Sequence, residues 1–173
     1  MPESTNELSL IRPMIHADLE QVLAWRNHPA VRRYMYTQHD ITLTEHQNWF
    51  ERVLQDLTKH LLIFEVSNQP LGFVSFSEVG DGGAADWGFY AAPDAPKGSG
   101  RQLGRAALTH AFTQLKLHKV CGQALAYNQR SILFHQSLGF QQEGILRDQH
   151  FDGERYHNVI SFGLLSNEWQ TSP

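Results

Sequence analysis

The sequence predicts a single mixed α/β (α+β) domain built on a mostly antiparallel, twisted sheet of about seven strands, flanked by four helices. Three observations predict this fold class. β-type runs and helical stripes follow one another in the order β-α-α-βββ-α-β-α-ββ. Short connectors between several β-type runs indicate antiparallel hairpins. The chain has 173 residues, of which 41% are hydrophobic and 18% charged, as expected of one globular domain.

The N-terminal part is expected to contain one strand and two helices. Residues 1–7 are polar and predict a disordered tail, and residues 8–13 predict a short strand. Asp18 can cap a first helix that ends near His28-Pro29. A second helix follows Thr44, which with Gln47 has the spacing of a capping box. Its apolar stripe consists of Phe50, Val53, Leu54 and Leu57. The segment between the helices, 32–39, is polar and aromatic and is expected to be irregular.

The middle of the chain predicts three strands and a helix. The strands are expected over 60–67, 71–79 and 84–92, with turns at 68–70 and 80–83. A helix is expected over 98–117, because apolar residues recur there every four positions. These residues are Leu103, Ala107, Ala111 and Leu115.

The C-terminal part is expected to add a strand over 119–127, a helix and a hairpin. Asn128 caps the helix, which Gly139 ends in a left-handed conformation. The hairpin has strands over 144–151 and 155–164 and turns at Asp152-Gly153. The domain therefore spans residues 8–165, with a C-terminal tail over 166–173.

Composition narrows the function classes. The net charge is −4 and no basic run is present, so nucleic acid is not expected as a partner. Met1 to Glu7 is polar and no apolar run reaches the length of a membrane span, so we expect a cytoplasmic protein with no membrane contact. The single cysteine, Cys121, is expected to be a buried structural thiol. Ten histidines include no pair with metal-ligand spacing beside a carboxylate, so no metal is expected.

The segment Lys97-Gly98-Ser99-Gly100-Arg101 carries the strongest functional signal. It leaves a β-type run and opens a helical pattern. Such a turn presents free backbone N–H groups at the positive end of the helix dipole, which suits a phosphate or pyrophosphate. Glycine lets a ligand approach the backbone closely. The alternative is a surface turn followed by a helix cap at Ser99.

Together with a second motif, this turn resembles the GNAT superfamily of acyl-CoA N-acyltransferases. The second motif runs from Asn128 through His135 to Leu138-Gly139-Phe140, and the resemblance covers about residues 8–165. In the preferred register Lys97 stands first and Gly100 matches the superfamily glycine. A second register, Arg101-x-x-Gly104-x-Ala106, would start inside the helix. Gly104 can then let the helix approach the sheet or the ligand.

The resemblance implies that acetyl-CoA is the co-substrate. Its pyrophosphate would lie on the amides of 98–101, and its pantetheine would pair with the preceding strand around residues 89–91. Asn128 either contacts the pantetheine or acts only as a helix cap. The implied cofactor-binding residues are Phe89, Tyr90, Ala91, Lys97, Gly98, Ser99, Gly100, Arg101, Asn128, Ser131 and Phe134.

Within the superfamily, the first half resembles the UDP-amino-sugar N-acetyltransferases of pseudaminic-acid biosynthesis. Those enzymes acetylate the 4-amino group of UDP-4-amino-4,6-dideoxy-N-acetyl-β-L-altrosamine. The resemblance implies that Arg26 and His46 lie near the nucleotide. It also implies that the sugar meets an apolar and aromatic surface made of Met35, Tyr36, Trp49 and Trp87. An arginine can bind a diphosphate bidentately, and an aromatic ring can stack on uracil or a hexose. The alternative is a solvated Arg26 and a core Trp49.

The acid and base of the reaction are less clear from the residues. Many relatives protonate the departing thiolate with a tyrosine at the position of His135. An imidazole could do the same, or His135 could be a helix residue that faces solvent. Relatives in this pathway place a glutamate at the position of Gln123, which cannot act as a base. Glu78 is the next candidate for the base and Asp86 follows, although both could be exposed carboxylates.

Three functions remain open at this point. The first is acetylation of a UDP-linked amino-dideoxy sugar. The second is another GNAT activity, on a peptide N-terminus or a polyamine. The third is a non-catalytic acyl-CoA-binding module, which the glutamine at 123 and the missing tyrosine slightly favour. The sequence is compatible with a homodimer.

Overall fold

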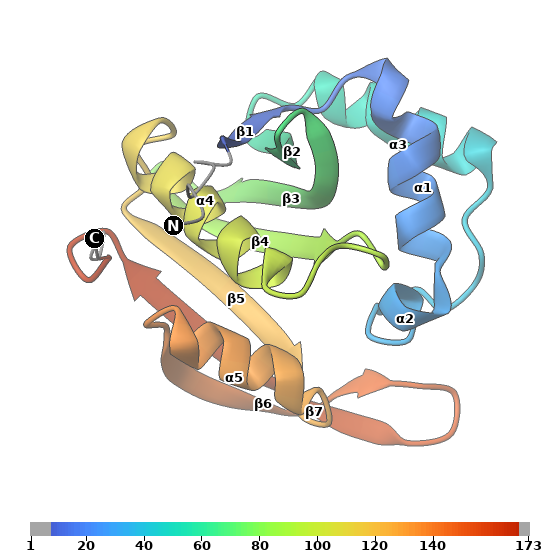
Figure 1. Ribbon diagram of the computed structural model, residues 1–173. Helices are drawn as coiled ribbons and strands as arrows, with labels where there is room; N and C mark the ends of the chain where they lie inside the picture. The colour runs from blue at the N-terminus through green and yellow to red at the C-terminus, as the bar shows by residue number, and fades with distance from the viewer. Residues whose placement is uncertain (1–7, 170–173) are drawn as a thin grey trace, which may run out of the picture.

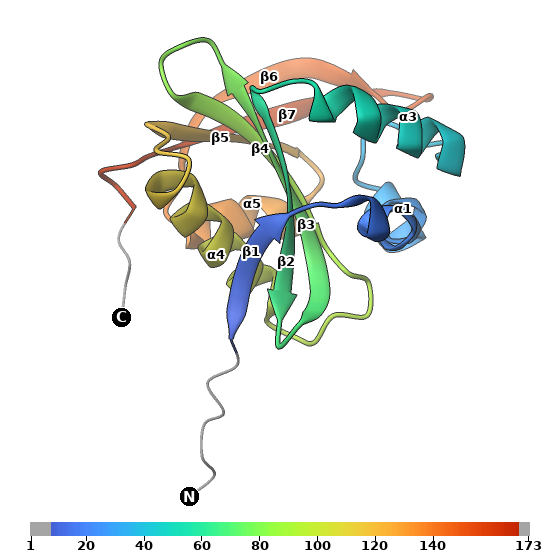
Figure 2. The same ribbon diagram turned by 90° about the horizontal axis from the view of Figure 1, so that it is seen from above.

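The computed structural model describes residues 8–169 and has a seven-stranded sheet with helices on both faces (Figures 1 and 2). The strand order is β1-β2-β3-β4-β5-β7-β6, and every neighbouring pair is antiparallel except β4–β5. This confirms the predicted fold class. The strands are β1 (Ser9–Pro13), β2 (Lys59–Val66), β3 (Gln69–Val79), β4 (Ala84–Ala91), β5 (Lys119–Leu125), β6 (Gln141–Phe151) and β7 (Tyr156–Leu165).

The helices are α1 (Leu19–Asn27), α2 (Pro29–Arg32), α3 (Leu43–Leu54), α4 (Ser99–Thr113) and α5 (Gln129–Ser137), with a 3-10 turn at His16–Asp18. The short α2 was not among the four helices expected from the sequence. Pro29 starts it instead of only ending α1, because the first position of a helix needs no N–H donor. The His28 ring caps it by accepting a hydrogen bond from Ala30 N (3.2 Å).

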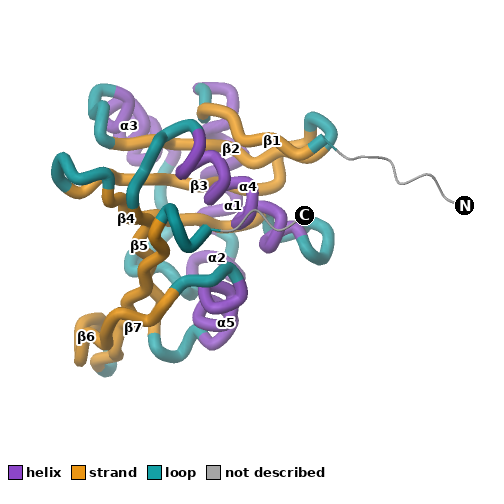
Figure 3. The backbone as a smooth tube through the Cα atoms, turned by 90° about the vertical axis from the view of Figure 1, so that its left-hand side faces the viewer, coloured by secondary structure: helices purple, strands orange, loops and turns teal. Residues whose placement is uncertain are grey.

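The sheet divides into two halves between β4 and β5. These strands pair at only three positions, from Ala84–Lys119 to Asp86–Cys121. Beyond that point β4 continues beside β3 to Ala91, while β5 continues beside β7 to Leu125. The two strands therefore diverge, as Figures 1 and 3 show. The divergence leaves one backbone edge of each strand without a sheet partner.

Two apolar cores cover opposite faces of the first half of the sheet. Helices α1 and α3 pack on one face through residues such as Val22, Trp25 and Phe50. Helix α4 packs on the other through Leu103, Leu108 and their neighbours. Figure 2 shows these two layers, with α5 on the same side as α4. Gly104 serves this packing. A Cβ there would lie 2.7 Å from Phe134 Cζ and 2.9 Å from Leu138 Cδ1, so the glycine lets α4 approach α5.

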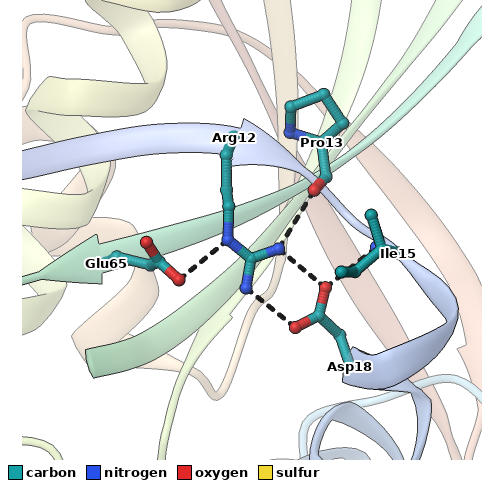
Figure 4. A network of polar contacts seen from close by, with 5 residues as sticks. All are labelled: Arg12, Pro13, Ile15, Asp18 and Glu65. Atoms are coloured by element: carbon teal, nitrogen blue, oxygen red, sulfur yellow. Dashed lines mark hydrogen bonds and ion pairs between the residues drawn. The ribbon is translucent and has the colours of Figure 1, made fainter. Parts of the chain in front are cut away.

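Arg12 ties β1 to β2 and to the start of α1 (Figure 4). Its Nε donates to Glu65 Oε1 (2.7 Å), and its two terminal nitrogens donate to the two oxygens of Asp18 (both 2.8 Å). Burial raises the pKa of Asp18, but Arg12 and the Ile15 N–H outweigh it and hold that pKa below its ordinary value. The prediction that the Asp18 side chain caps α1 is therefore wrong. The Asp18 carboxylate accepts hydrogen bonds from Arg12 and from Ile15 N, and it makes no cap hydrogen bond to α1.

The start of α3 also differs from the prediction. The N-cap is Thr42, two residues earlier than expected, and its capping-box partner is Glu45. Thr42 Oγ1 accepts from Glu45 N (3.2 Å), while Thr42 N donates to Glu45 Oε2 (2.7 Å). Both Thr42 and Thr44 have an acidic or amide residue three positions on, so local sequence did not distinguish them. The stripe is shorter as well, because Leu54 is half-exposed and Leu57 is exposed.

The ends of the domain agree with the sequence only in part. Gly139 has the predicted left-handed conformation (φ 93°). Residues 166–169 are not a free tail, since Ser166 N donates to His118 O (2.9 Å) and Trp169 packs against Phe112. The expected tail over 1–7 lies outside the described residues, as do residues 170–173. No helix within 8–169 is long and apolar enough to cross a membrane.

Candidate active site

A cleft of about 990 Å³ opens where β4 and β5 diverge. Its walls come from β4 and β5, the start of α4, the first turn of α5, and the segment joining α1 to α3. Ligand sites usually occupy about 300–1,000 Å³, so this cleft lies at the upper end of that range.

The start of α4, where the sequence predicts an anion site, lines the cleft. Gly98 is the N-cap, with a φ of +93° that other residues rarely adopt. Ser99 is therefore not the cap: it is the first helical residue and is buried. The first turn of a helix lacks carbonyl partners for its N–H groups. A Cβ on Gly100 would have no atom within 4 Å, so the space above this turn is open.

The edge of β4 leads from this turn into the cleft. Gly88, Phe89, Tyr90 and Ala91 all line the cleft and lie beyond the last β4–β5 pair. Their backbone groups on that edge can bond to an extended ligand as a further strand would. Asn128 lines the cleft too, and its side chain accepts from Ser131 N (3.1 Å), so it does cap α5.

We call the wall formed by α1, α3 and the segment between them the acceptor side, because the resemblance predicts the acceptor there. Five residues expected there line it: Arg26, Met35, Tyr36, His46 and Trp49. The His46 ring stacks on Trp49 with centroids 5.1 Å apart and planes 20° apart. Trp49 therefore holds His46 in place and is itself neither fully buried nor isolated from the cleft.

Arg26 and His46 each carry a buried nitrogen without a hydrogen-bond partner. Arg26 Nη2 donates to Thr37 O (3.2 Å), but Nη1 is buried and unpaired. Burial lowers the pKa of Arg26. His46 Nε2 is likewise buried and has no hydrogen-bond partner. Burial, with a smaller contribution from Arg26, lowers the pKa of His46. Unpaired buried polar atoms are costly, so both nitrogens indicate a polar ligand.

His135 does not reach the cleft. Its side chain is only 1% exposed, and both ring nitrogens are occupied. Trp87 Nε1 donates to His135 Nε2 (3.1 Å), and His135 Nδ1 donates to Ser131 O (2.8 Å). An indole N–H can only donate, so Nδ1 carries the proton of a neutral ring. Burial lowers the pKa of His135, which keeps the ring neutral.

His135 is therefore not a residue that faces solvent, and it lies outside the cleft lining. It anchors α5 to the sheet instead. Its ring stacks on Phe162 with centroids 4.9 Å apart. Through its hydrogen bond it fixes Trp87, which does line the cleft as expected.

The base candidates are placed differently from one another. Gln123 and Asp86 line the cleft. Glu78 does not: its carboxylate lies 4.0 Å from the His60 ring, away from the lining. Gln123 Oε1 accepts a hydrogen bond from the Tyr36 hydroxyl (3.1 Å), which joins the acceptor side to β5.

The position of Cys121 differs from the sequence prediction. It is half-buried and lines the cleft, so it is not a buried structural thiol. Burial raises the pKa of its thiol, so the thiol stays protonated and is a poor nucleophile.

Most of the residues expected from the sequence come together at this cleft. Of the cofactor set, only Arg101 is outside the lining. The second register starts at this residue, inside α4. The lining residues that the sequence did not indicate include Tyr34, Ser75, Leu103, Leu125 and Arg130. Among residues 8–169, no three His, Cys, Asp or Glu side chains gather into a group that could hold a metal ion.

Comparison with known proteins identifies the kind of site. The Acetyltransferase (GNAT) domain family matches residues 9–141. The acetyltransferase PseH of Campylobacter jejuni is 26% identical over 71% of this chain and 76% of its own length. The spermidine N(1)-acetyltransferase of Escherichia coli is 23% identical over 92% of this chain and 87% of its own.

A solved structure shows the same fold. The spermidine N-acetyltransferase of Vibrio cholerae, crystallised with CoA and spermine, superimposes with a TM-score of 0.86. It is 23% identical, and the match covers 92% of this chain and 96% of that one. The named relatives are acetyltransferases, so the alternative of a non-catalytic acyl-CoA-binding module finds no support among them.

Proposed function

The chain belongs to the acetyltransferase (GNAT) family and is an acetyl-CoA-dependent N-acetyltransferase; within that family, we propose that it acetylates the 4-amino group of a UDP-linked amino-dideoxy sugar. The sequence resemblance supports this acceptor, and so does the chemistry of the acceptor side. A spermidine-type acceptor is the second candidate, because the spermidine acetyltransferases match the chain over a larger share of its length.

The pair Arg26 and His46 carries the proposal. Arg26 Nη1 can only donate a hydrogen bond, and it has no partner. His46 Nε2 also has no partner, and a neutral imidazole nitrogen accepts or donates according to its tautomer. A ligand that satisfies both nitrogens must offer an acceptor to Arg26 and a polar group to His46. The oxygens of a diphosphate or uracil, together with a hydroxyl or imide N–H, meet this need. A polyamine has only donors near neutral pH and would leave Arg26 unpaired.

The charges in the lining also favour an anionic acceptor. The carboxylates that line the cleft are those of Glu45 and Asp86. Glu45 is engaged in the α3 capping box and lies 3.6 Å from the His39 ring. Of these two carboxylates, only Asp86 would remain to pair with a polycation. The polycation would also lie in the same cleft as the partly desolvated, positively charged Arg26. An anion beside Arg26 would instead offset the cost of burying that guanidinium.

Aromatic and apolar side chains complete the acceptor side. Met35 and Tyr36 lie on the segment between α2 and α3, across from the His46–Trp49 stack. Phe73 packs edge-on against Trp49 with centroids 6.3 Å apart, which steadies the stack from the sheet. Such surfaces suit the uracil ring and the apolar face of a 6-deoxy sugar.

The reaction we propose is direct transfer in a ternary complex. The pyrophosphate of acetyl-CoA would bind the amides at the start of α4, and its pantetheine would lie along residues 88–91. The unprotonated amine attacks the thioester carbonyl carbon: the C–N bond forms, the C–S bond breaks, and the sulfur leaves as a thiolate. An acceptor that arrives as an ammonium loses two protons, one to the thiolate sulfur and one to solvent. Holding both substrates in one cleft supplies much of the rate.

The decisive experiment compares three acceptors. Wild-type protein is incubated with acetyl-CoA and UDP-4-amino-4,6-dideoxy-N-acetyl-β-L-altrosamine, the same sugar without UDP, or spermidine. The product is followed by mass and by release of the CoA thiol. We expect the highest kcat/KM with the UDP-linked sugar, because binding energy from the nucleotide orients the amine. Equal use of the free sugar, or a preference for spermidine, would overturn the proposal and favour the second candidate.

A matched pair of variants tests the role of Arg26. Hydrogen bonds that involve a charged group contribute about 1.5–3 kcal/mol, so Arg26→Ala should lower kcat/KM for the UDP-linked sugar about 10- to 150-fold. Its use of the free sugar should change little. Arg33→Ala is the control, since Arg33 is an arginine at the end of α2 that lies outside the lining and over the Tyr34 ring. Equal effects of both variants on both sugars would contradict the assignment.

The predicted compartment and assembly remain proposals. Acetyl-CoA and UDP-sugars are cytoplasmic metabolites, so the proposed reaction is consistent with a cytoplasmic protein. A homodimer remains a prediction.

A further inference from the structure

We propose that His150 is the catalytic base that accepts the proton of the acceptor amine. The inference rests on the acetyltransferase activity and holds for either candidate acceptor. It fills the position left open by Gln123, whose amide cannot take a proton.

An irregularity in β6 places His150 beside the reaction site. The pairing with β7 shifts between Leu146 and His150, so that three residues of β6 lie opposite one residue of β7. Within this bulge Asp148 has a φ of +49°, and its N–H donates to Asn158 Oδ1 (3.0 Å). Bulges re-aim side chains and are frequent next to active sites. On a strand whose side chains are otherwise exposed or half-exposed, His150 is the buried one, 8% exposed.

His150 lines a hollow that adjoins the main cleft. The hollow has a volume of about 240 Å³ and is lined by Tyr36, Gln123, Gln149 and His150. Tyr36 and Gln123 also line the cleft, so their hydrogen bond is the partition between the two spaces. The hollow is polar and large enough for several water molecules. A proton could therefore pass from an amine beside Gln123 to His150 through one water.

The ring nitrogen of His150 is free to take that proton. His150 Nε2 is buried and has no hydrogen-bond partner. The ring packs against Tyr36, with centroids 5.1 Å apart. Tyr36 is 55% exposed and lies on a segment without regular secondary structure, so its ring can turn aside when an acceptor enters. That movement would open Nε2 to the hollow.

The groups around His150 are compatible with a protonated imidazole. His157 on β7 is parallel to it at a centroid distance of 6.5 Å, and Tyr127 packs edge-on against His157. His157 is paired with Asp152 (2.5 Å). Hydrogen bonds from Arg155 N, the His157 ring and Glu154 N hold the pKa of Asp152 well below its ordinary value, so this carboxylate stays ionised and offsets positive charge on the hairpin. Burial raises the pKa of Tyr36, which therefore faces His150 as a neutral phenol.

The proton balance of the step is complete. His150 takes one proton from the acceptor ammonium, and the free amine then attacks the thioester carbon. The second proton on nitrogen ends on the CoA sulfur after the C–S bond breaks. His150 returns its proton to solvent before the next turnover. Imidazole suits this task, because a general base works best when its ordinary pKa is near the working pH.

The test uses His150→Gln and His150→Ala, assayed with the faster of the UDP-linked amino-sugar and spermidine. At neutral pH both variants should lose about 10²- to 10⁴-fold in kcat/KM. The loss should shrink as pH rises and solution removes the amine proton without help. Added imidazole should restore part of the activity of His150→Ala. The control is His60→Asn, outside the cleft lining and near Glu78, which should retain nearly the wild-type rate.

A merely structural role would give a different pattern. A loss that does not change with pH, is not rescued by imidazole and is matched by His60→Asn would overturn the proposal, as would unchanged turnover in His150→Gln. An acetyl-CoA-induced thermal shift equal to that of the wild type shows that each variant is folded. The choice of acceptor is decided separately, because a wild-type preference for spermidine refutes the UDP-sugar acceptor and leaves the His150 comparison intact.

Discussion

Gly122→Ala should destabilise the protein, because no side chain fits between Trp87 and His135. A Cβ at position 122 would lie 2.5 Å from His135 Nε2 and 2.8 Å from Trp87 Nε1. It would sit on the hydrogen bond that joins these two nitrogens. The His135 ring is fully buried and stacked on Phe162, so it cannot move aside freely.

The expected magnitude follows from three contributions. Forcing a methyl group into a packed core costs about 1–3 kcal/mol. Breaking the Trp87–His135 bond leaves a buried donor and acceptor unpaired, which costs about 1–3 kcal/mol more. Alanine restricts the unfolded chain relative to glycine and returns about 0.4–1 kcal/mol. The free energy of unfolding should therefore fall by about 1–5.5 kcal/mol, or about 2–22 °C in Tm for a domain of this size.

Urea denaturation at pH 7.5 measures this change, as a lower midpoint with an unchanged slope. Gly144→Ala is the matched control, since a Cβ there has no atom within 4 Å. That variant should stay within about 0.5 kcal/mol of the wild type. If Gly122→Ala unfolds at the same urea concentration as Gly144→Ala, the two rings do not meet at this point, and the anchoring role of His135 is refuted.

Three further predictions concern the cofactor turn, pH and a helix cap. Acetyl-CoA at about one hundred times its Kd should stabilise the wild type by about 2.7 kcal/mol, which is measured as a rise in Tm. Gly100→Val should abolish this rise and Gly82→Val should keep it. Both glycines have open space around them, but only Gly100 lines the cleft. Burial lowers the pKa values of His46 and His135, so the unfolded chain binds more protons, and the urea midpoint should fall as pH drops below about 6.5; an unchanged midpoint down to pH 5 would contradict this. Thr42→Ala should lower the free energy of unfolding in urea by about 1 kcal/mol, because it removes the α3 cap. If only Thr44→Ala lowers it, Thr44 is the cap, as the sequence predicted.

Local sequence patterns determined the fold class and the Gly-rich turn that lines the cleft at the start of α4. The alternation of β-type runs and apolar helical stripes predicted seven strands and the four longer helices, because each pattern depends on residues only a few positions apart. The turn at 97–101 was predictable for the same reason: glycines, the preceding strand and the following helix are all local. The acceptor residues Arg26, His46 and Trp49 were found through resemblance, and the structure brings them to one wall of the cleft.

Tertiary structure decided which polar side chains face the cleft and which are buried elsewhere. His135 is on the predicted helix, but long-range packing against Trp87 and Phe162 gives its ring an internal role. Glu78 lies on a predicted strand and is still outside the lining. His150 reaches the hollow only because β6 bulges and because a loop more than one hundred positions earlier brings Tyr36 against it. Contacts between residues so far apart leave no local pattern, so the sequence predicted the elements while the pairing of the sheet placed the chemistry.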